Sequence, residues 1–218
     1  MSPGVKRETP LLAEYCRLLA AAPVGVTAVR DIDELRRLHV DDALTALPLV
    51  TRLSPAAIVD VGSGGGSPGI PLAISTEAAV TLVEARAAKA SFLRDTVRRL
   101  GLSCEVLHDR SETLARGAGR DRWDLAVARA LAPPPAAAEM CLPLVRPSGH
   151  LLLWAANLDA DALAQTAALL NAELVEVEPT EGARVLALLR KAGPTPERFP
   201  RRPGRARRRP PGSIPSGA

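Results

Sequence analysis

Two kinds of hydrophobic pattern alternate along the chain. Short apolar runs rich in Val, Ile and Leu predict buried strands, and the longer stretches between them, with apolar residues three or four positions apart, predict amphipathic helices. Seven strands are expected, at Ile58–Val61, Thr81–Glu84, Cys104–Leu107, Leu125–Ala128, His150–Trp154, Glu173–Val177 and Val185–Leu189. Because helices alternate with strands, the pattern predicts an α/β protein with a doubly wound, mostly parallel sheet of seven strands.

The segments between the strands carry their own helix signals. Apolar residues on one face predict a helix from Ala87 to Leu100, which Gly101 ends. Pro68 and Pro71 allow only a short or late-starting helix after the first strand. Further helices are expected at Arg110–Leu114, Pro135–Leu144 and Asp159–Leu170. A short turn at Gly182 predicts that the last two strands form an antiparallel hairpin.

Three helices are expected before the first strand. Thr9 and Pro10 precede the first helix, Asp31 caps the second, and Asp41 with Asp42 begins the third. We therefore expect an N-terminal helical extension over residues 1–50 that packs on the sheet and a main domain over 51–192. Residues 193–218 are rich in Pro, Arg and Gly, which predicts a basic tail without a packed core, partly disordered.

Composition excludes several classes of protein. The three cysteines are odd in number and form no C-x-x-C pair, which argues against a disulfide framework and a zinc site. The three histidines are scattered, and neither a nucleophile elbow nor a phosphate-binding G-x-x-x-x-G-K-S/T motif is present. There is no signal peptide and no apolar run long enough to cross a bilayer. We expect a cytoplasmic monomer that binds neither metal nor membrane.

The basic charge is concentrated near the C-terminus. Nine Lys and Arg residues lie between Arg190 and Arg209, against the single acid Glu197, although the whole chain carries only +4. A solvated tail is one interpretation. Arginines clustered with proline beside a nucleotide-binding fold are also typical of RNA backbone binding, and aromatic residues are too few for base stacking to dominate. We predict that RNA contacts Arg198, Arg201 and Arg202.

The glycine-rich stretch Ile58–Pro71, IVDVGSGGGSPGIP, is the strongest candidate for a binding site. Glycines tolerate positive φ and let backbone lie directly against a ligand, and such a loop after a strand binds nucleotide-like ligands. The triplet Gly64, Gly66 and Gly69 fits a dinucleotide fingerprint, so an NAD-linked oxidoreductase is one alternative. The form D-x-G-x-G-x-G, from Asp60 to Gly66 through Gly62, instead resembles the first motif of class I S-adenosylmethionine (SAM) methyltransferases.

Polar residues follow the next three predicted strands. Glu84, 24 residues after Asp60, can accept hydrogen bonds from both hydroxyls of a ribose in either cofactor. After the third strand, backbone amides at Ser111 and Glu112 can read an adenine ring, although a helix-capping role for Ser111 is the alternative. Arg129 follows the fourth strand, at an end that lines the crevice of such a sheet.

Several segments, taken in order, are similar to the ribosomal small-subunit RNA guanine-N7 methyltransferase family, also called glucose-inhibited division protein B. They cover most of residues 27–204 and comprise TAVRDIDELRRLHVDDAL, VDVGSGGGSPGIPLAI, LVEARAAKASFLRDTVRRLGL, RSE, DLAVARALAPP, CLPLVRPSGHLLLW and PTPERFPRRPG. The resemblance implies the Rossmann-like fold of class I SAM-dependent methyltransferases, SAM as cofactor, and ribosomal RNA or the small subunit as partner. The residues that it implies for SAM binding are Asp60, Gly62, Gly64, Gly66, Gly69, Glu84, Ser111, Glu112 and Arg129.

The resemblance also implies a simple reaction, with Arg129 at the site of methyl transfer. Guanine N7 has an exposed lone pair and no proton to lose, so its attack on a sulfonium methyl group needs no general base. Arg129 can donate to guanine O6 on the same edge and orient N7. A catalytically idle relative that binds RNA without transferring a methyl group is the second alternative.

Overall fold

The computed structural model describes residues 9–180 and 184–211. The chain forms two compact units, one up to His108 and the other from Asp109 onward, which we call the first and second units. Seven strands lie in the described residues, three in the first unit and four in the second. Because helices alternate with them, the predicted α/β class is confirmed.

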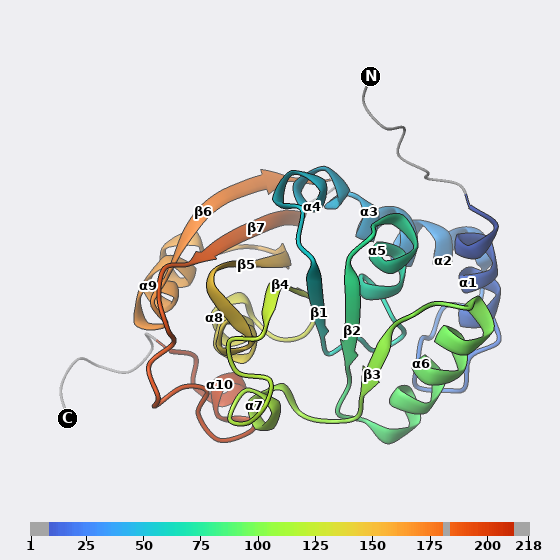
Figure 1. The fold of residues 1–218 in the computed structure, drawn as a ribbon. Coiled ribbons are helices and arrows are strands. Elements are labelled where there is room, and N and C mark those ends of the chain that lie inside the picture. Colours follow the sequence, from blue (N-terminus) through green and yellow to red (C-terminus); the bar gives the residue numbers. More distant parts are fainter. Residues whose placement is uncertain (1–8, 181–183, 212–218) are drawn as a thin grey trace. The chain divides into compact units, whose positions relative to one another are not determined.

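Three parallel strands form the sheet of the first unit (Figure 1). They are β1 (Ala57–Val61), β2 (Ala79–Val83) and β3 (Glu105–Leu107), in the spatial order β3-β2-β1. Val83 is in register with Val61 on one side and with Leu107 on the other. All three strands therefore end at one edge, and Gly62 and Glu84 follow β1 and β2 there.

Two helices connect these strands. α5 (Gly69–Ser75) is short, as the prolines predict, and α6 (Ala87–Leu100) has the predicted bounds. The buried face of α6 carries Ala90, Leu93 and Val97, and the helix ends where Gly101 adopts a φ of 64°. This left-handed conformation is the usual reason for glycine at a helix end. α5 packs against β2, and α6 packs against β3.

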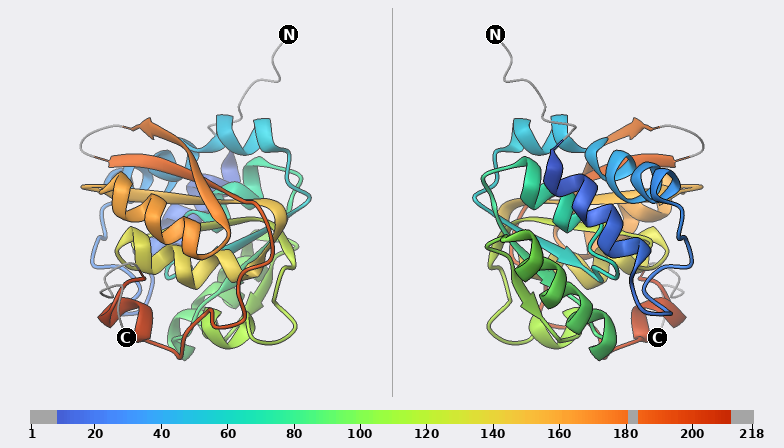
Figure 2. Two further views of the ribbon diagram at one scale, coloured as in Figure 1. Left: turned by 90° about the vertical axis from the view of Figure 1, so that its left-hand side faces the viewer. Right: turned by 90° about the vertical axis from the view of Figure 1, so that its right-hand side faces the viewer.

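The N-terminal helices pack against α5 and α6. α1 (Pro10–Ala20) contacts both, and Figure 2 shows it beside α6. Thr9 caps α1 by accepting from the Leu12 amide at 3.3 Å, and Asp31 caps α2 (Ile32–Leu35) by accepting from the Glu34 amide at 2.8 Å. The predicted cap at Asp31 is confirmed.

The predicted start of a third helix at Asp41 and Asp42 is wrong. The chain stays helical from α2 through a π-helical segment, η1 (Arg36–Asp41), into α3 (Asp42–Leu44). Neither aspartate caps a helix, and Asp41 instead pairs with Arg36 at 2.9 Å. A new helix, α4 (Leu47–Leu53), begins only where Pro48 enters its first turn, the position at which proline's missing N–H is tolerated.

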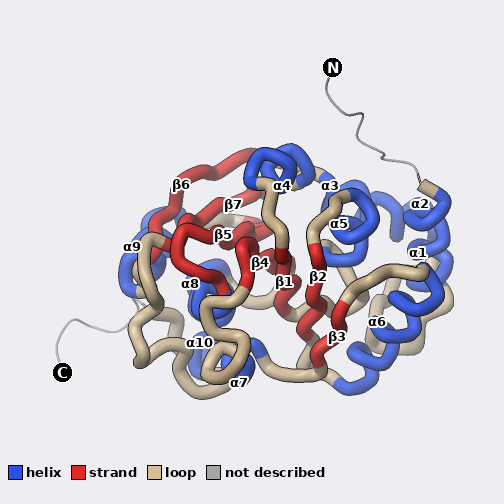
Figure 3. The backbone as a smooth tube through the Cα atoms, viewed as in Figure 1, coloured by secondary structure: helices blue, strands red, loops and turns tan. Residues whose placement is uncertain are grey.

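The second unit contains four strands in the order β4-β5-β7-β6 (Figure 3). They are β4 (Trp123–Arg129), β5 (Val145–Ala156), β6 (Ala172–Pro179) and β7 (Arg184–Lys191). β4 and β5 are parallel, whereas β7 is antiparallel to β5 and to β6. The antiparallel pairing predicted for the last two strands is confirmed, and the turn expected at Gly182 lies outside the described residues.

In the described residues of the second unit, one α-helix precedes these strands and three lie between or after them. They are α7 (Ser111–Leu114), α8 (Pro134–Cys141), α9 (Ala160–Leu169) and α10 (Arg205–Arg208), with a 3₁₀ turn, η2 (Leu142–Leu144), directly after α8. α8 packs against β4 and β5, and α9 packs against β6. In the described part of the chain, no helix is long and apolar enough to cross a membrane.

The segment 193–211 is packed against the second unit, in contrast to the unpacked tail that its composition predicts. Phe199 and Ala206 are buried. Arg116 donates to the Pro200 carbonyl at 2.7 Å, and Arg120 donates to the Phe199 carbonyl at 3.0 Å. Arginines elsewhere in the unit therefore satisfy the carbonyls of a segment too rich in proline to form a strand or a long helix. Residues 212–218 lie outside the described residues.

Candidate functional site

The glycine loop turns sharply at the carboxyl end of β1. The amides of Gly62 and Ser63 both donate to the Val83 carbonyl, at 2.8 and 3.1 Å, which holds the loop beside the end of β2. Gly64 and Gly66 have φ angles of 58° and 105°, which side-chain-bearing residues rarely adopt. A Cβ atom on Gly66 would also lie 2.4 Å from Ile70 Cδ1. The sequence places glycines where this turn requires them.

Glu84 faces the same loop. Its carboxylate accepts hydrogen bonds from the Gly64 amide at 3.0 Å and from the Arg86 amide at 2.8 Å, one on each oxygen, and the residue is 7% exposed. A carboxylate has about four acceptor positions, so each oxygen keeps one that the two amides do not use. The acid is thus fixed in place and still able to accept from two hydroxyl groups.

Asp60 and Gly69 set where α5 begins. The Asp60 carboxylate is 1% exposed and accepts from the Gly69 amide at 3.0 Å. A Cβ atom on Gly69 would lie 2.7 Å from that carboxylate and 2.4 Å from Leu82 Cδ2, so the position admits only glycine. Both residues were predicted to bind the cofactor. Their contacts hold the backbone that follows the loop, and their binding to the cofactor stays a prediction.

Residues of the N-terminal helices also support the loop, and sequence analysis missed them. The buried Tyr15 hydroxyl donates to the Gly65 carbonyl at 3.1 Å, and Ser67 donates to the His39 carbonyl at 2.7 Å. A Cβ atom on Gly65 would lie 3.1 Å from Leu19 Cδ2. The signal for Tyr15 was present, since the only tyrosine of the chain lies on the apolar face of a helix and a buried hydroxyl needs a partner.

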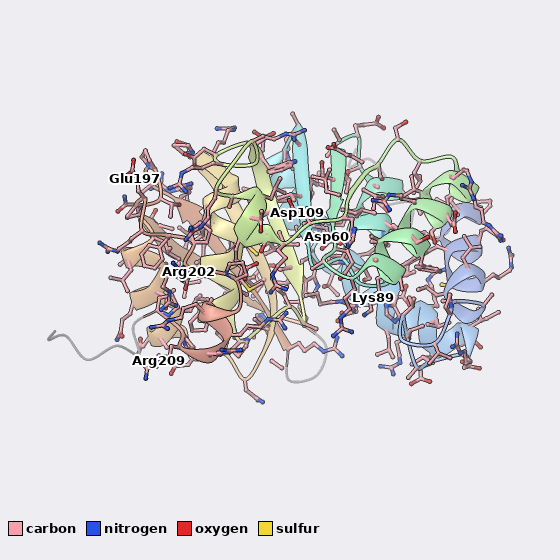
Figure 4. All side chains as sticks on the ribbon, turned by 90° about the horizontal axis from the view of Figure 1, so that it is seen from below. Asp60, Lys89, Asp109, Glu197, Arg202 and Arg209 are labelled. Carbon is pink, nitrogen blue, oxygen red and sulfur yellow. The ribbon has the colours of Figure 1, made fainter. Side chains whose placement is uncertain are left out.

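The first unit therefore has the features that a nucleoside site needs. A loop with glycine at positions 62, 64, 65 and 66 ends beside a fixed carboxylate, and Lys89 of α6, labelled in Figure 4, brings its Nζ to 4.0 Å from the place where a Gly64 Cβ would lie. Carboxylate oxygens suit the hydroxyls of a ribose, and bare backbone permits close approach of a nucleoside. The residues present fit a nucleoside cofactor such as SAM.

Ser111 and Glu112 begin α7 in the second unit, and both are buried. Arg110 occupies the position before the helix, and no side chain caps it, so the capping role for Ser111 is wrong. The Glu112 carboxylate accepts from the Gly204 amide at 3.0 Å and lies 3.7 Å from Arg110 Nε. Glu112 therefore connects the start of α7 to the C-terminal segment.

Arg129 is the last residue of β4, in register with Trp154 of β5. Its neighbour Ala130 adopts a φ of 53°, so the chain turns sharply directly after the arginine. The side chain of Arg129 is half-buried at the end of a parallel strand, the position that sequence analysis predicted.

The three arginines predicted to contact RNA have different environments. The Arg201 guanidinium bonds the Glu139 carboxylate at 2.9 Å and the Arg209 carbonyl at 2.6 Å, and Glu139 is 1% exposed. Arg198 lies over the Phe199 ring, 5.2 Å from its centroid. Arg202 is exposed and lines an open pocket of about 440 Å³. Of the three, the structure leaves only the Arg202 side chain without an internal role.

Lys191 also belongs to the basic run in the sequence, but it is a core residue. Its ammonium group is fully buried, pairs with Asp121 and donates to the Val145 carbonyl at 2.6 Å. Burial lowers the pKa of Lys191 from its ordinary value, while Asp121 opposes that shift. The basic run is therefore smaller at the surface than in the sequence.

The residues that the structure describes contain no group of three or more His, Cys, Asp and Glu side chains that could hold a metal ion.

Comparison with known proteins identifies the family of the chain. The family model described as rRNA small subunit methyltransferase G matches residues 9–185. The chain is 38% identical to the ribosomal RNA small subunit methyltransferase G of Rubrobacter xylanophilus, covering 95% of this chain and 86% of that protein. It is 40% identical to the protein of the same name from Chloroflexus aggregans, covering 85% of this chain and 82% of that protein.

The similarity to solved structures is one of fold, because the sequence identities are low. The crystal structure of a putative O-methyltransferase from Klebsiella pneumoniae superposes with a TM-score of 0.53 at 18% identity, covering 88% of this chain and 93% of that one. The [4+2]-cyclase SpnF superposes with a TM-score of 0.59 at 15% identity, covering 84% and 93%. The predicted Rossmann-like fold of class I SAM-dependent methyltransferases is confirmed. Since the family model spans most of the chain and the curated relatives match it nearly end to end, the chain belongs to the rRNA small subunit methyltransferase G family.

Proposed function

We propose that this protein transfers the methyl group of SAM to N7 of a guanine in small-subunit ribosomal RNA. Membership of the family supports a SAM-dependent rRNA methyltransferase. The observation that carries the assignment to this chain is the arrangement of the glycine loop and Glu84, a backbone cradle beside a fixed acceptor. The resemblance to the family described above further indicates guanine N7 as the atom that accepts the methyl group.

The cofactor is held by residues with separate tasks. Glu84 accepts from the ribose hydroxyls, and the backbone at Gly62, Gly64 and Gly66 lies against the nucleoside. The resemblance to the family adds the amides of Ser111 and Glu112 as the group that reads the adenine ring. When bound, SAM supplies a methyl group on a positively charged sulfur. Asp60 and Gly69 act indirectly, because they fix the start of α5.

The acceptor needs orientation more than activation. Guanine N7 carries a free lone pair, so no residue has to remove a proton before the methyl group is transferred. Arg129 donates to guanine O6 and thereby presents N7 to the methyl group, a task of alignment. The guanidinium suits this role because it stays charged and offers several donors in a fixed plane.

RNA is the macromolecular partner, bound through exposed arginines of the segment 193–211. We further propose that the protein acts in the cytoplasm as a monomer and without a metal ion. Contacts between these arginines and the phosphate backbone of RNA are electrostatic, so the affinity for RNA should fall steeply as the salt concentration rises.

The test is methyl transfer itself. Small ribosomal subunits and stripped small-subunit RNA are each incubated with methyl-labelled SAM, and the labelled nucleotide is mapped by digestion and mass spectrometry. We expect label on one guanine, at N7, in at least one of the two substrates. Transfer to another base or another atom would overturn the assignment of N7.

Two further outcomes would identify the alternatives. RNA binding without any transfer indicates a catalytically idle relative. Calorimetric titration with SAM, S-adenosylhomocysteine and NAD distinguishes the oxidoreductase, because only that class binds NAD in preference to the two sulfur compounds.

A further inference from the structure

Seven arginines lie between Arg198 and Arg209, and the structure divides them into two groups. Three have internal partners: Arg201 bonds Glu139, Arg198 lies over Phe199, and Arg207 donates to the Leu131 carbonyl at 2.7 Å. The other four are exposed, and their guanidinium groups have no hydrogen-bond or ion-pair partner anywhere in residues 9–180 and 184–211. These four are Arg202, Arg205, Arg208 and Arg209.

The four arginines without partners line one pocket. Together with Pro203 and Gly204 they enclose about 440 Å³ of open space, which we call the arginine pocket. Arg202 and Arg209 mark the two ends of this stretch in Figure 4. Among the described residues, no acidic side chain lines the pocket, so four positive charges share the lining without an acidic member. Such an arrangement is unfavourable in the absence of an anion and favourable in its presence.

Contacts directly before and within the arginine pocket hold it in shape. Just before it, Arg201 is fixed by Glu139 through both its backbone amide at 2.8 Å and its guanidinium at 2.9 Å. Within it, the Gly204 amide donates to the buried carboxylate of Glu112 at 3.0 Å. Ala206, between two of the lining arginines, is buried. A pocket held in this way loses little further entropy when a ligand binds.

The internal ion pair also occupies the acid that contacts Arg201, the residue directly before the pocket. Glu139 could otherwise neutralise the lining arginines, but its two oxygens are occupied by Arg201. The exposed acid of the segment, Glu197, does not line the pocket. The structure thus separates an arginine with a structural role from four whose charge remains available.

We propose that the arginine pocket binds phosphodiester groups of the ribosomal RNA substrate, an inference that rests on the proposed function. Guanidinium groups bond phosphate oxygens in pairs, and several around one open pocket suit a chain of phosphates more than a single small anion. No aromatic side chain is among the described residues that line the pocket, so we expect contact with the RNA phosphate backbone and no stacking on bases. The pocket contributes affinity and leaves the choice of base to other residues.

The test compares two double variants of the full chain that lose the same charge. R205A/R208A removes two lining arginines, whereas R94A/R99A removes two exposed arginines of α6. Alanine keeps helix propensity, and the buried Ala206 is unchanged, so R205A/R208A should fold. Binding of small-subunit RNA is measured by fluorescence anisotropy at salt concentrations from about 50 to 200 mM.

We expect R205A/R208A to bind RNA at least roughly tenfold more weakly at low salt. The slope of log affinity against log salt should be less steep by about 1.4, since each lost phosphate contact on single-stranded nucleic acid changes it by roughly 0.7. R94A/R99A should bind like the wild type. R205K/R208K, which keeps the charge, should recover part of the affinity but not the paired geometry.

The outcomes separate this inference from the proposed function. If the wild type methylates ribosomal RNA and R205A/R208A keeps its affinity and salt slope, the arginine pocket is not a phosphate site, and the function stands. If the wild type transfers no methyl group but R205A/R208A still loses RNA affinity, the function fails, and the pocket stands. An equal loss of RNA affinity in R94A/R99A would also contradict the proposal that the arginine pocket binds phosphates. Displacement of RNA by polyglutamate at matched charge concentration would contradict it as well.

Discussion

The hydroxyl of Tyr15, on the first helix, donates a hydrogen bond to the carbonyl of Gly65, in the middle of the glycine loop, across 3.1 Å. Fifty positions separate the two residues in sequence. The ring of Tyr15 is fully buried, so the hydroxyl is held by packing as well as by the bond. The N-terminal helices therefore help to define the shape of the loop that we propose for SAM.

Tyr15→Phe should weaken SAM binding without abolishing it. The substitution removes one hydrogen bond, a net loss of about 0.5 to 1.5 kcal/mol, and keeps the buried ring. Calorimetric titration should show SAM affinity lowered roughly two- to tenfold, with RNA affinity unchanged. Leu11→Ala, at an exposed position of the same helix, is the control and should leave SAM affinity as it is. Wild-type affinity in Tyr15→Phe would mean that the bond does not shape the binding site.

Glu84→Gln should have a larger effect on the cofactor. Both carboxylate oxygens accept from backbone amides, at Gly64 and Arg86, so the amide group of glutamine must turn its own N–H toward one of them. Hydrogen bonds to a charged group contribute about 1.5 to 3 kcal/mol, which predicts SAM affinity lowered roughly 10- to 100-fold.

The matched control for that substitution is Glu77→Gln, which removes the same charge from an exposed position in the first unit. Calorimetry should find its SAM affinity unaltered. A Glu84→Gln variant that binds SAM as tightly as the wild type would exclude Glu84 as the ribose acceptor.

Local signals predicted the helices and strands that bear the site. The apolar face of α6 and the left-handed Gly101 are properties of neighbouring residues, so both ends of that helix were correct. The strand end at Val61 and the glycines after it are equally local. Asp41 and Asp42 were wrongly predicted to begin a helix. They lie within a helical stretch that continues through a π-helical segment, where Asp41 forms an ion pair with Arg36.

Long-range partners could not be predicted. The sequence shows Lys191 and Arg201 only as members of a basic run, whereas folding places them against Asp121 and Glu139, 70 and 62 positions away. Charge counted along a segment does not reveal which cations are neutralised inside the protein. The arginines that we propose for RNA binding therefore differ from those first expected, with Arg202 the only one in common.

Arg129→Ala should reduce turnover and spare SAM binding. If the guanidinium donates to guanine O6 during transfer, its loss removes one oriented donor, an effect of roughly 10² to 10³ in kcat. Arg129→Lys keeps the charge but not the planar pair of donors, so it should recover only part of the rate. Steady-state kinetics with subunit RNA and calorimetry with SAM measure the two effects separately. A collapse of SAM affinity, with the rate restored by saturating SAM, would assign Arg129 to the cofactor site.

Cys104, just before β3, should make the stability of the protein depend on pH in the alkaline range. Burial raises the pKa of this thiol from 9.0 to about 11. Between these values the unfolded chain releases a proton that the folded chain keeps, so the free energy of unfolding falls as pH rises from 9.0 to about 11. Urea unfolding across this range should show a steeper decline for the wild type than for Cys104→Ala. Identical slopes would contradict the raised pKa.

Glu139→Gln should release the C-terminal segment. The carboxylate is 1% exposed and bonds both the amide and the guanidinium of Arg201, and removal of one partner of a buried ion pair is destabilising by about 3 to 5 kcal/mol. Trypsin should then cleave after Arg201 faster than in the wild type, and RNA affinity should fall because the arginine pocket loses its support. Glu197→Gln, at an exposed acid of the same segment, is the control and should alter neither. An unchanged cleavage rate in Glu139→Gln would show that the other contacts, such as those of Arg116 and Arg120, hold the segment by themselves.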